Sequence, residues 1–230
     1  GVDIRDLKQS ELHNLIGYVP QKANLFSGNI RENINYGSSK NLSDEEIIEA
    51  LKIAQAWDFV QKLPEDLNEK VSQGGKNFSG GQKQRLSIAR AIASKAPILI
   101  FDDSFSALDY KTDAKLRAEL AVKTKSQTKF IVAQRVTSIM QADKIIVLDG
   151  GKIVGIGTHG ELLKNNEIYR EIASSQLSDE EIEMQIKDFE KQKTISKTQK
   201  NTKKAVSVSK KIAKKSLKKV ISKKSKKGEK

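Results

Sequence analysis

The residues between Phe78 and Asp109 carry two patterns that are suited to phosphate chemistry. The first is the turn Ser79-Gly-Gly-Gln82, which precedes a helical pattern. Adjacent glycines let backbone N–H groups approach a phosphate closely, and the N-terminus of a helix carries a partial positive charge. The second is an apolar run that ends in Asp102 and Asp103. Two carboxylates at the end of a buried strand are suited to hold Mg²⁺ and an attacking water for phosphoryl transfer.

The elements that must position these residues alternate between helix and strand. A helix is predicted around Lys8–Asn14, a strand at Ile16–Val19, and a helix from the capping box Ser43–Glu46 to about Gln61. Further predicted helices are Gln82–Ser94, Thr112–Ala121, a short one capped by Thr158–Glu161, and one from Ser178–Glu181 toward Lys193. Further predicted strands are Pro97–Asp102, Lys129–Ala133, Lys144–Leu148 and, after a hairpin turn, Lys152–Ile156. The alternation predicts an α/β fold with a parallel sheet that is covered on both faces.

Three motifs in this order resemble the ATP-binding cassette (ABC) family. They are Phe78-Ser-Gly-Gly-Gln82 as the signature, Ile98-Leu-Ile-Phe-Asp-Asp103 as Walker B, and Ser106-Ala-Leu-Asp109 as the D-loop. The resemblance implies a P-loop NTPase-like parallel core with a helical signature subdomain, and two cassettes that enclose ATP between them. It further implies that the γ-phosphate of a nucleotide held by the partner cassette is bound by Ser79, Gly80, Gly81 and Gln82, and that Asp109 of the D-loop is a further nucleotide-binding residue.

The same resemblance assigns residues to the metal and to the transmembrane contact. Gln21 is similar to the Q-loop glutamine, which helps to hold Mg²⁺ and water and relays the nucleotide state to the transmembrane part. Asp102 is similar to the carboxylate on the Mg²⁺ side. The stretch Leu25–Ile30 resembles the exporter version of this loop. Within it, Phe26 is expected either to contact a coupling helix or to pack in the core, and the sequence leaves both readings open.

Two positions depart from the family pattern. Asp103 stands where the family usually has a glutamate that acts as general base, so its carboxylate falls about 1.5 Å short, a misplacement that costs up to ~10²-fold in rate. Gln134 stands where the family has the switch histidine, and glutamine accepts no proton. The only histidines are His13 and His159, and His159 is expected at the surface or at a helix cap. The two departures resemble the degenerate-site subunit of heterodimeric ABC multidrug or lipid exporters.

A phosphate loop of the form Gly-x-x-x-x-Gly-Lys-Ser/Thr does not occur in the 230 residues. We therefore expect the chain to be a C-terminal fragment that lacks the N-terminal strands and the phosphate loop, with a transmembrane domain encoded upstream in the same chain. The fragment alone is expected to be inactive. There is no cysteine, which excludes disulfides and cysteine-based metal sites. No apolar run reaches the ~18 residues of a membrane span.

The positive charge is concentrated at the C-terminus. Residues 191–230 contain 17 lysines and one acidic residue, Glu229, so the net charge of +13 for the whole chain leaves −3 on residues 1–190. The predicted organisation is a partial nucleotide-binding domain at 1–176 with its helical subdomain at about 43–94, a C-terminal helix at 177–193, and a Lys-rich disordered tail at 194–230. The tail is expected to bind anionic lipid or RNA, and a surface-binding amphipathic helix is the alternative.

These features predict the nucleotide-binding domain of an ABC exporter. It would bind ATP and Mg²⁺ between two cassettes at the cytoplasmic face of the cell membrane, hydrolyse ATP as part of the full transporter, and pair with a second cassette subunit in a heterodimer. One alternative is a soluble ABC ATPase of chromosome maintenance or translation. Only residues 22–78 lie between Gln21 and the signature, without heptads, which argues against the chromosome type. The other alternative is a polyanion-binding module that uses the basic tail.

Overall fold

The structure, a computed structural model, describes residues 2–38 and 41–191 of the chain. These residues belong to two compact units, one that ends at Ile139 and one that begins at Met140. All of the predicted site residues lie in the first unit. The predicted tail at 194–230 lies outside the described residues, as does the end of the predicted helix at 177–193.

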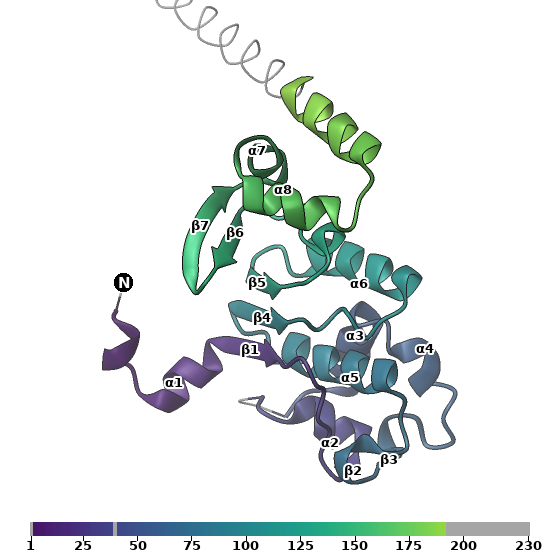
Figure 1. The fold of residues 1–230 in the computed structure, drawn as a ribbon. Helices are drawn as coiled ribbons and strands as arrows, with labels where there is room; N and C mark the ends of the chain where they lie inside the picture. Colours follow the sequence, from purple (N-terminus) through teal and green to yellow (C-terminus); the bar gives the residue numbers. More distant parts are fainter. Residues whose placement is uncertain (1, 39–40, 192–230) are drawn as a thin grey trace, which may run out of the picture. The chain divides into compact units, whose positions relative to one another are not determined.

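The first unit is built on a three-stranded parallel sheet (Figure 1). Its strands are β1 (Ile16–Val19), β4 (Ile98–Asp102) and β5 (Thr128–Val132), in the order β1-β4-β5. Tyr18 lies opposite Ile100, which lies opposite Phe130. The predicted α/β fold with a parallel sheet is confirmed, and β4, the strand that ends in the two aspartates, is the central strand.

Helices and short strands connect and cover this sheet. The α-helices of the first unit are α1 (Gln9–Asn14), α2 (Ile30–Asn35), α3 (Asp44–Ile53), α4 (Trp57–Val60), α5 (Gly80–Ala93) and α6 (Tyr110–Lys123). The 3₁₀ turns are η1 (Ile4–Asp6), η2 (Asp66–Asn68), η3 (Gln73–Gly75) and η4 (Val136–Ser138), and β2 (Gly28–Asn29) pairs antiparallel with β3 (Lys70–Val71). The sequence reading missed α2 and the β2–β3 pair, which are too short for a periodic pattern to identify.

The core of the first unit lies on one face of the sheet. Val19, Leu99 and Phe101, which alternate with outward residues along β1 and β4, are fully buried. They belong to the same apolar cluster as Leu86 and Ile88 of α5. Helix α5 contacts β1, α2 and α3, so the helix that follows the Ser-Gly-Gly-Gln turn is fixed on three sides.

The opposite face of the sheet is open among the described residues. Tyr18, Phe130 and Val132 are 52%, 54% and 56% exposed. All three occupy the alternate positions that point away from the buried face. The prediction of a sheet covered on both faces is therefore wrong for the part of the chain that the structure describes, because no described element packs against these side chains closely enough to bury them.

The predicted helix 44–61 is interrupted. Ser43 caps it as predicted, with Glu46 closing the capping box, but α3 ends at Ile53 and α4 begins at Trp57. Gln55 has φ = 56°, and the N–H of Ala56 donates to the carbonyl of Leu51 at 2.7 Å. A left-handed residue followed by such a bond is a helix-terminating motif. It turns the chain, and the prediction of one continuous helix is wrong.

The second unit consists of a hairpin followed by helices. Strands β6 (Ile145–Asp149) and β7 (Lys152–Gly157) are antiparallel, and α7 (His159–Asn165) and α8 (Glu167–Ser174) follow. Residues 179–191 are also helical. Thr158 and Glu161 form the predicted capping box of α7. The hairpin and the first and last helices are confirmed over the described residues, whereas α8 was not predicted.

His159 is neither a surface residue nor the helix cap, which corrects the expectation. It is the first residue of α7 and is 9% exposed. Its Nδ1 lies 2.8 Å from the Tyr169 hydroxyl and its Nε2 lies 2.6 Å from Oε1 of Gln185. Burial raises the pKa of Tyr169 to about 12. The imidazole therefore joins α7, α8 and the helix 179–191, which is a structural role.

A search of the described residues for a membrane span finds no helix with the length and apolar character that crossing a bilayer requires.

Gly17 gives a test of the packing between β1 and α5. A Cβ at this position would lie 2.7 Å from Cδ2 of Leu99 and 2.9 Å from the carbonyl oxygen of Ala91. Gly17→Ala is expected to lower the free energy of unfolding by about 1–3 kcal/mol, because the strain of overpacking outweighs the ~0.4–1 kcal/mol gained from the unfolded chain. Urea titration measures the change. Thr128→Ala, at an exposed position of β5, is the control, and an unchanged or higher stability of Gly17→Ala would contradict the packing described here.

Candidate functional site

The turn at Ser79 begins helix α5. The Ser79 hydroxyl accepts a hydrogen bond from the N–H of Gln82 at 3.3 Å, and Oε1 of Gln82 accepts one from the N–H of Ser79 at 2.8 Å. Gly80 and Gly81 are the first two residues of the helix, and no atom would lie within 4 Å of a Cβ at Gly80. The turn therefore presents the N-terminus of a 14-residue helix with little side-chain cover, a geometry that suits an anion.

Two side chains in the first half of α5 fix this turn. Gln84, 2% exposed, donates its amide to the carbonyl of Pro20 at 3.2 Å. Arg85 donates to the carbonyl of Gln55 at 2.7 Å, and its guanidinium lies 4.8 Å from the centre of the Phe59 ring. Desolvation by burial lowers the pKa of Arg85. The turn is thus tied to the residue before Gln21 on one side and to the α3–α4 turn on the other.

The Ser106–Asp109 loop lies against the Ser79 turn. A Cβ at Gly81 would be 3.4 Å from the carbonyl oxygen of Ala107. Asp109 caps α6, accepting from the N–H of Thr112 at 3.0 Å. Hydrogen bonds from Thr112, through its side chain and its backbone, hold the pKa of the exposed Asp109 carboxyl below its usual value. The structure therefore brings Gly81 and the loop that ends at Asp109 together, as the motifs require.

A second group of residues lies where the three parallel strands end. Gln21 follows β1, Asp102 ends β4, Asp103 comes directly after it, and Gln134 follows β5. The Tyr18 hydroxyl donates to Oδ2 of Asp102 at 3.0 Å, and this bond raises the pKa of the tyrosine. Because carboxyl ends of parallel strands meet at one edge of a sheet, the topology alone brings these four residues together.

Asp103 is the centre of this group. Its Oδ2 accepts from Nε2 of Gln21 at 3.3 Å and from Nε2 of Gln134 at 2.9 Å. Its backbone has φ = 44°, a left-handed conformation that aspartate tolerates better than most residues. Its carbonyl oxygen accepts from the Ser106 hydroxyl at 2.8 Å. One carboxylate oxygen thus joins the loops that follow the two outer strands.

The arrangement suits a cation only if other ligands are added. The described residues contain no cluster of three or more His, Cys, Asp or Glu that could hold a metal by itself. Asp102 offers a half-buried carboxylate on the open side of the sheet. Gln21 uses its amide nitrogen for Asp103, and its side-chain oxygen is the atom with which it could bind a cation. The pair fits Mg²⁺, which is usually held by one or two protein ligands together with phosphate oxygens and water.

Two contributors were missed in the sequence. Tyr18 lies on the same face as Asp102 and diagonally across from it, so the alternation of β1 and β4 could have identified the pair. Ser104 donates its hydroxyl to the carbonyl of Val19 at 3.0 Å and is fully buried. No pattern in the sequence indicates this bond, because it depends on the strand register.

Comparison with known proteins finds similarity to ABC transporters. Residues 1–106 match a family model described as "ABC transporter". An uncharacterized ABC transporter ATP-binding protein of Mycobacterium tuberculosis is 47% identical over 178 residues, which are 76% of this chain and 30% of that protein. An ATP-dependent lipid A-core flippase of Francisella tularensis is 42% identical over 177 residues, 77% of this chain and 29% of the flippase. A solved bacterial Atm1-family ABC exporter with ATP bound superimposes with a TM-score of 0.73 at 35% identity, over 76% of this chain and 31% of the exporter.

The chain is part of an ABC transporter ATP-binding domain. It spans about 30% of the length of the relatives it matches. An ABC ATP-binding domain implies ATP as its nucleotide. The ATP-binding domain here presents two groups of predicted site residues, one at the start of α5 and one at the carboxyl edge of the sheet.

Proposed function

We propose that this ABC ATP-binding domain works within an exporter at the cytoplasmic face of the cell membrane, binding ATP and Mg²⁺ between two cassettes to drive transport. The observation that carries the proposal is the proximity of Gly81 to the carbonyl oxygen of Ala107, which would lie 3.4 Å from a Cβ at Gly81. It places the glycine turn and the Ser106–Asp109 loop on one surface, where a nucleotide held by a second cassette would meet both. The relatives' greater length supports a transmembrane domain in the same polypeptide.

Each group of residues has its own task in this proposal. Ser79, Gly80, Gly81 and Gln82 bind the γ-phosphate of the partner's nucleotide through the start of α5, and Asp109 lies beside them; the exposed turn and its capping box support this role. Asp102 and Gln21 hold Mg²⁺ at the nucleotide that this chain's own half-site completes. Magnesium neutralises charge on the phosphates. The residues of this chain orient the cation and the water around it.

Hydrolysis at the half-site completed by this chain is proposed to be slow. Oδ2 of the Asp103 carboxylate already accepts two amide hydrogen bonds, so this oxygen is engaged where a general base must accept a hydrogen bond from the attacking water. Gln134 donates a hydrogen bond there but does not gain a proton during turnover. These contacts support a degenerate site and therefore a heterodimer, in which a second subunit supplies the competent Walker B residues.

The exposure of Phe26 supports the proposal that this residue contacts the transmembrane part. It is 42% exposed, so of the two readings that the sequence left open, ordinary core packing does not describe it. Its ring lies 4.3 Å from that of Tyr36, and the Arg90 guanidinium lies 5.0 Å from its centre. Arg90 also donates to the carbonyl of Asn33 at 2.7 Å. The exposed aromatic pair is thus held rigidly by α5, as a contact surface for a coupling helix requires.

The open face of the sheet supports the proposal that a segment with a phosphate loop packs against it in the full-length protein. A phosphate loop belongs to a strand–loop–helix unit, and such a unit could cover Tyr18, Phe130 and Val132 while it brings the loop toward Asp102. The 230 residues contain no Gly-x-x-x-x-Gly-Lys motif. The donors that hold the β- and γ-phosphates in a P-loop protein are therefore outside this sequence.

The first prediction concerns nucleotide binding by the 230-residue chain alone. We expect a dissociation constant for MgATP weaker than about 1 mM, because the loop amides and the lysine that bind the phosphates are missing. Isothermal titration calorimetry measures it, with the assembled two-cassette complex as the positive control. A micromolar constant for the isolated chain would contradict the proposal.

The second prediction concerns Gly81 in the full-length subunit with its partner. Gly81→Asp is expected to reduce ATP turnover about 10²-fold, because it places a carboxylate against the γ-phosphate at the partner's site. Gly81→Ala is the matched control, since a Cβ there meets the Ala107 carbonyl at an ordinary contact distance of 3.4 Å. It should fold and lose much less activity. Turnover near wild type in Gly81→Asp would show that the asymmetric assignment is wrong.

The basic C-terminus supports an additional polyanion-binding function. Seventeen lysines and one acidic residue between 191 and 230 attract anionic lipid by about 1 kcal/mol for each lysine near the surface. They attract RNA through phosphate contacts in the same way. No aromatic residue follows Phe189, so base stacking contributes nothing to RNA binding.

The third prediction is that deletion of residues 191–230 abolishes binding to anionic vesicles or RNA at low salt and leaves the unfolding transition unchanged. The physical reason is that residues 1–190 carry a net charge of −3, which repels phosphates. Vesicle cosedimentation and RNA filter binding measure the loss. A chain with the same tail composition in shuffled order should bind like the original. Undiminished binding after the deletion would place the basic surface elsewhere.

A further inference from the structure

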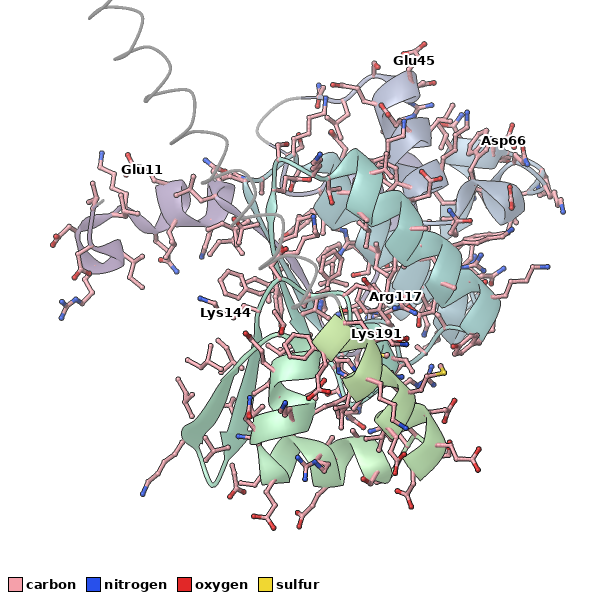
Figure 2. All side chains as sticks on the ribbon, turned by 90° about the horizontal axis from the view of Figure 1, so that it is seen from above. Glu11, Glu45, Asp66, Arg117, Lys144 and Lys191 are labelled. Carbon is pink, nitrogen blue, oxygen red and sulfur yellow. The ribbon has the colours of Figure 1, made fainter. Side chains whose placement is uncertain are left out.

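A buried ion pair on α6 reaches the segment that contains Gln134. Arg117, which is labelled in Figure 2, donates from Nε to Oδ1 of Asp113 at 2.9 Å and from Nη2 to Oδ2 at 3.2 Å. Its Nη1 donates to the carbonyl of Thr137 at 3.0 Å. Asp113 is 2% exposed. A guanidinium that bonds both oxygens of one carboxylate is held in a fixed plane. Its third contact therefore points in a fixed direction, at the turn η4.

The segment held in this way is short and packed. Val136 is 1% exposed and Ser138 is 8% exposed. The N–H of Ser138 donates to the carbonyl of Arg135, and the N–H of Ile139 to that of Val136, both at 3.0 Å. Thr137 lies three residues after Gln134, whose amide bonds Asp103. Displacement of Thr137 therefore moves the donor that holds the Asp103 carboxylate.

The other end of α6 lies at the nucleotide-facing loop. Asp109 caps the helix, and Arg117 is eight residues further on, about 12 Å along the axis. Leu116 and Leu120 are buried, which keeps the helix from rotating. The loop that ends at Asp109 contacts Gly81 through Ala107. The Ser79 turn, the loop, α6 and the segment 134–139 therefore form a continuous series of contacts.

We propose that Arg117 is a positioning residue that holds segment 134–139 to α6, so that the Ser106–Asp109 loop and Gln134 move together. The first half of this statement concerns the chain alone. The second half rests on the proposed function: the partner's nucleotide meets the Ser79 turn, and its state reaches Asp103 and Gln134 of this chain through α6. A second tie exists, from Nη2 of Arg135 to the carbonyl of Ser106, but at 3.5 Å it is long.

Amide hydrogen exchange in the 230-residue chain tests the first half. Arg117→Lys keeps a positive charge beside Asp113, but a single ammonium does not reproduce the planar fork that also reaches Thr137. Exchange of the Ser138 and Ile139 amides should become about 10-fold faster, as expected for loss of a charge-assisted hydrogen bond. Amides in β1 and the middle of α5 should keep their rates. Unchanged exchange at 138 and 139, or equal acceleration throughout the first unit, would overturn the proposal.

Lys123→Met is the matched control. Lys123 lies on the same helix and pairs with Glu49 at 3.5 Å, with both side chains about half exposed or more. If Arg117→Lys fails to fold, the neutral double variant Arg117→Met with Asp113→Asn replaces it, since it leaves no unpaired buried charge. The double variant should show the same local acceleration at Ser138 and Ile139, and its absence there would overturn the proposal.

The assembled exporter tests the second half. Arg117→Lys should lower kcat for ATP about 10-fold, the same loss of one charge-assisted hydrogen bond, because turnover occurs at the partner's site and the loop that meets this nucleotide is held through α6, which Asp109 caps. KM should stay within about 2-fold, because the nucleotide contacts themselves are kept. Lys123→Met should change neither constant. Identical kcat values for the two variants would overturn the coupling. A wild-type complex without ATPase activity would instead refute the proposed function, while the exchange experiment would still decide whether Arg117 positions the segment.

Discussion

The position of β4 between two parallel neighbours is the constraint on which the candidate site depends. Because β1 and β5 flank β4 in the same direction, the three chains leave the sheet at one edge. Gln21, Asp103 and Gln134 meet there although more than 80 residues separate the first from the second. Each strand is only four or five residues long. A shift of register by one residue would turn Asp102 to the buried face, so the apolar alternation of β4 also sets the direction of the carboxylate.

Helix α5 extends this edge to the glycine turn by using long polar side chains in the interior. Gln84, Arg85 and Arg90 each donate to backbone carbonyls that are distant in sequence. Burial lowers the pKa of Arg85 and Arg90. The carbonyl acceptors and the aromatic rings beside the two guanidinium groups compensate for the hydration that they lose on burial. A purely apolar helix face would bury more surface, but it would leave the loop carbonyls of Pro20, Gln55 and Asn33 without these donors. The polar contacts therefore fix loops, which apolar packing alone does not do.

The capping boxes predicted from the sequence at Ser43 and Thr158 are both formed, because a cap depends only on residues three apart. The box at Asn29 and Glu32, which starts the unpredicted helix α2, is the same kind of local signal. Long-range geometry was not predictable in the same way. The end of α3 depends on a left-handed Gln55, for which the sequence has no glycine signal. The role of His159 depends on Gln185, 26 residues away. The role of Arg117 depends on the position of Thr137, which no local pattern gives.

The two groups of site residues differ in what their chemistry requires. In the proposed function, the start of α5 acts through backbone N–H groups and a helix dipole, and neither needs a side chain that takes up a proton. The edge of the sheet would need a base, and there the carboxylate of Asp103 is shared by two glutamine amides. Substitutions at Asp103 and Gln134 therefore leave the α5 turn intact, since its geometry rests on Ser79, Gln82 and Gln84. A chain of this kind can keep the surface that it offers to a partner's nucleotide while the half-site it completes itself loses its base.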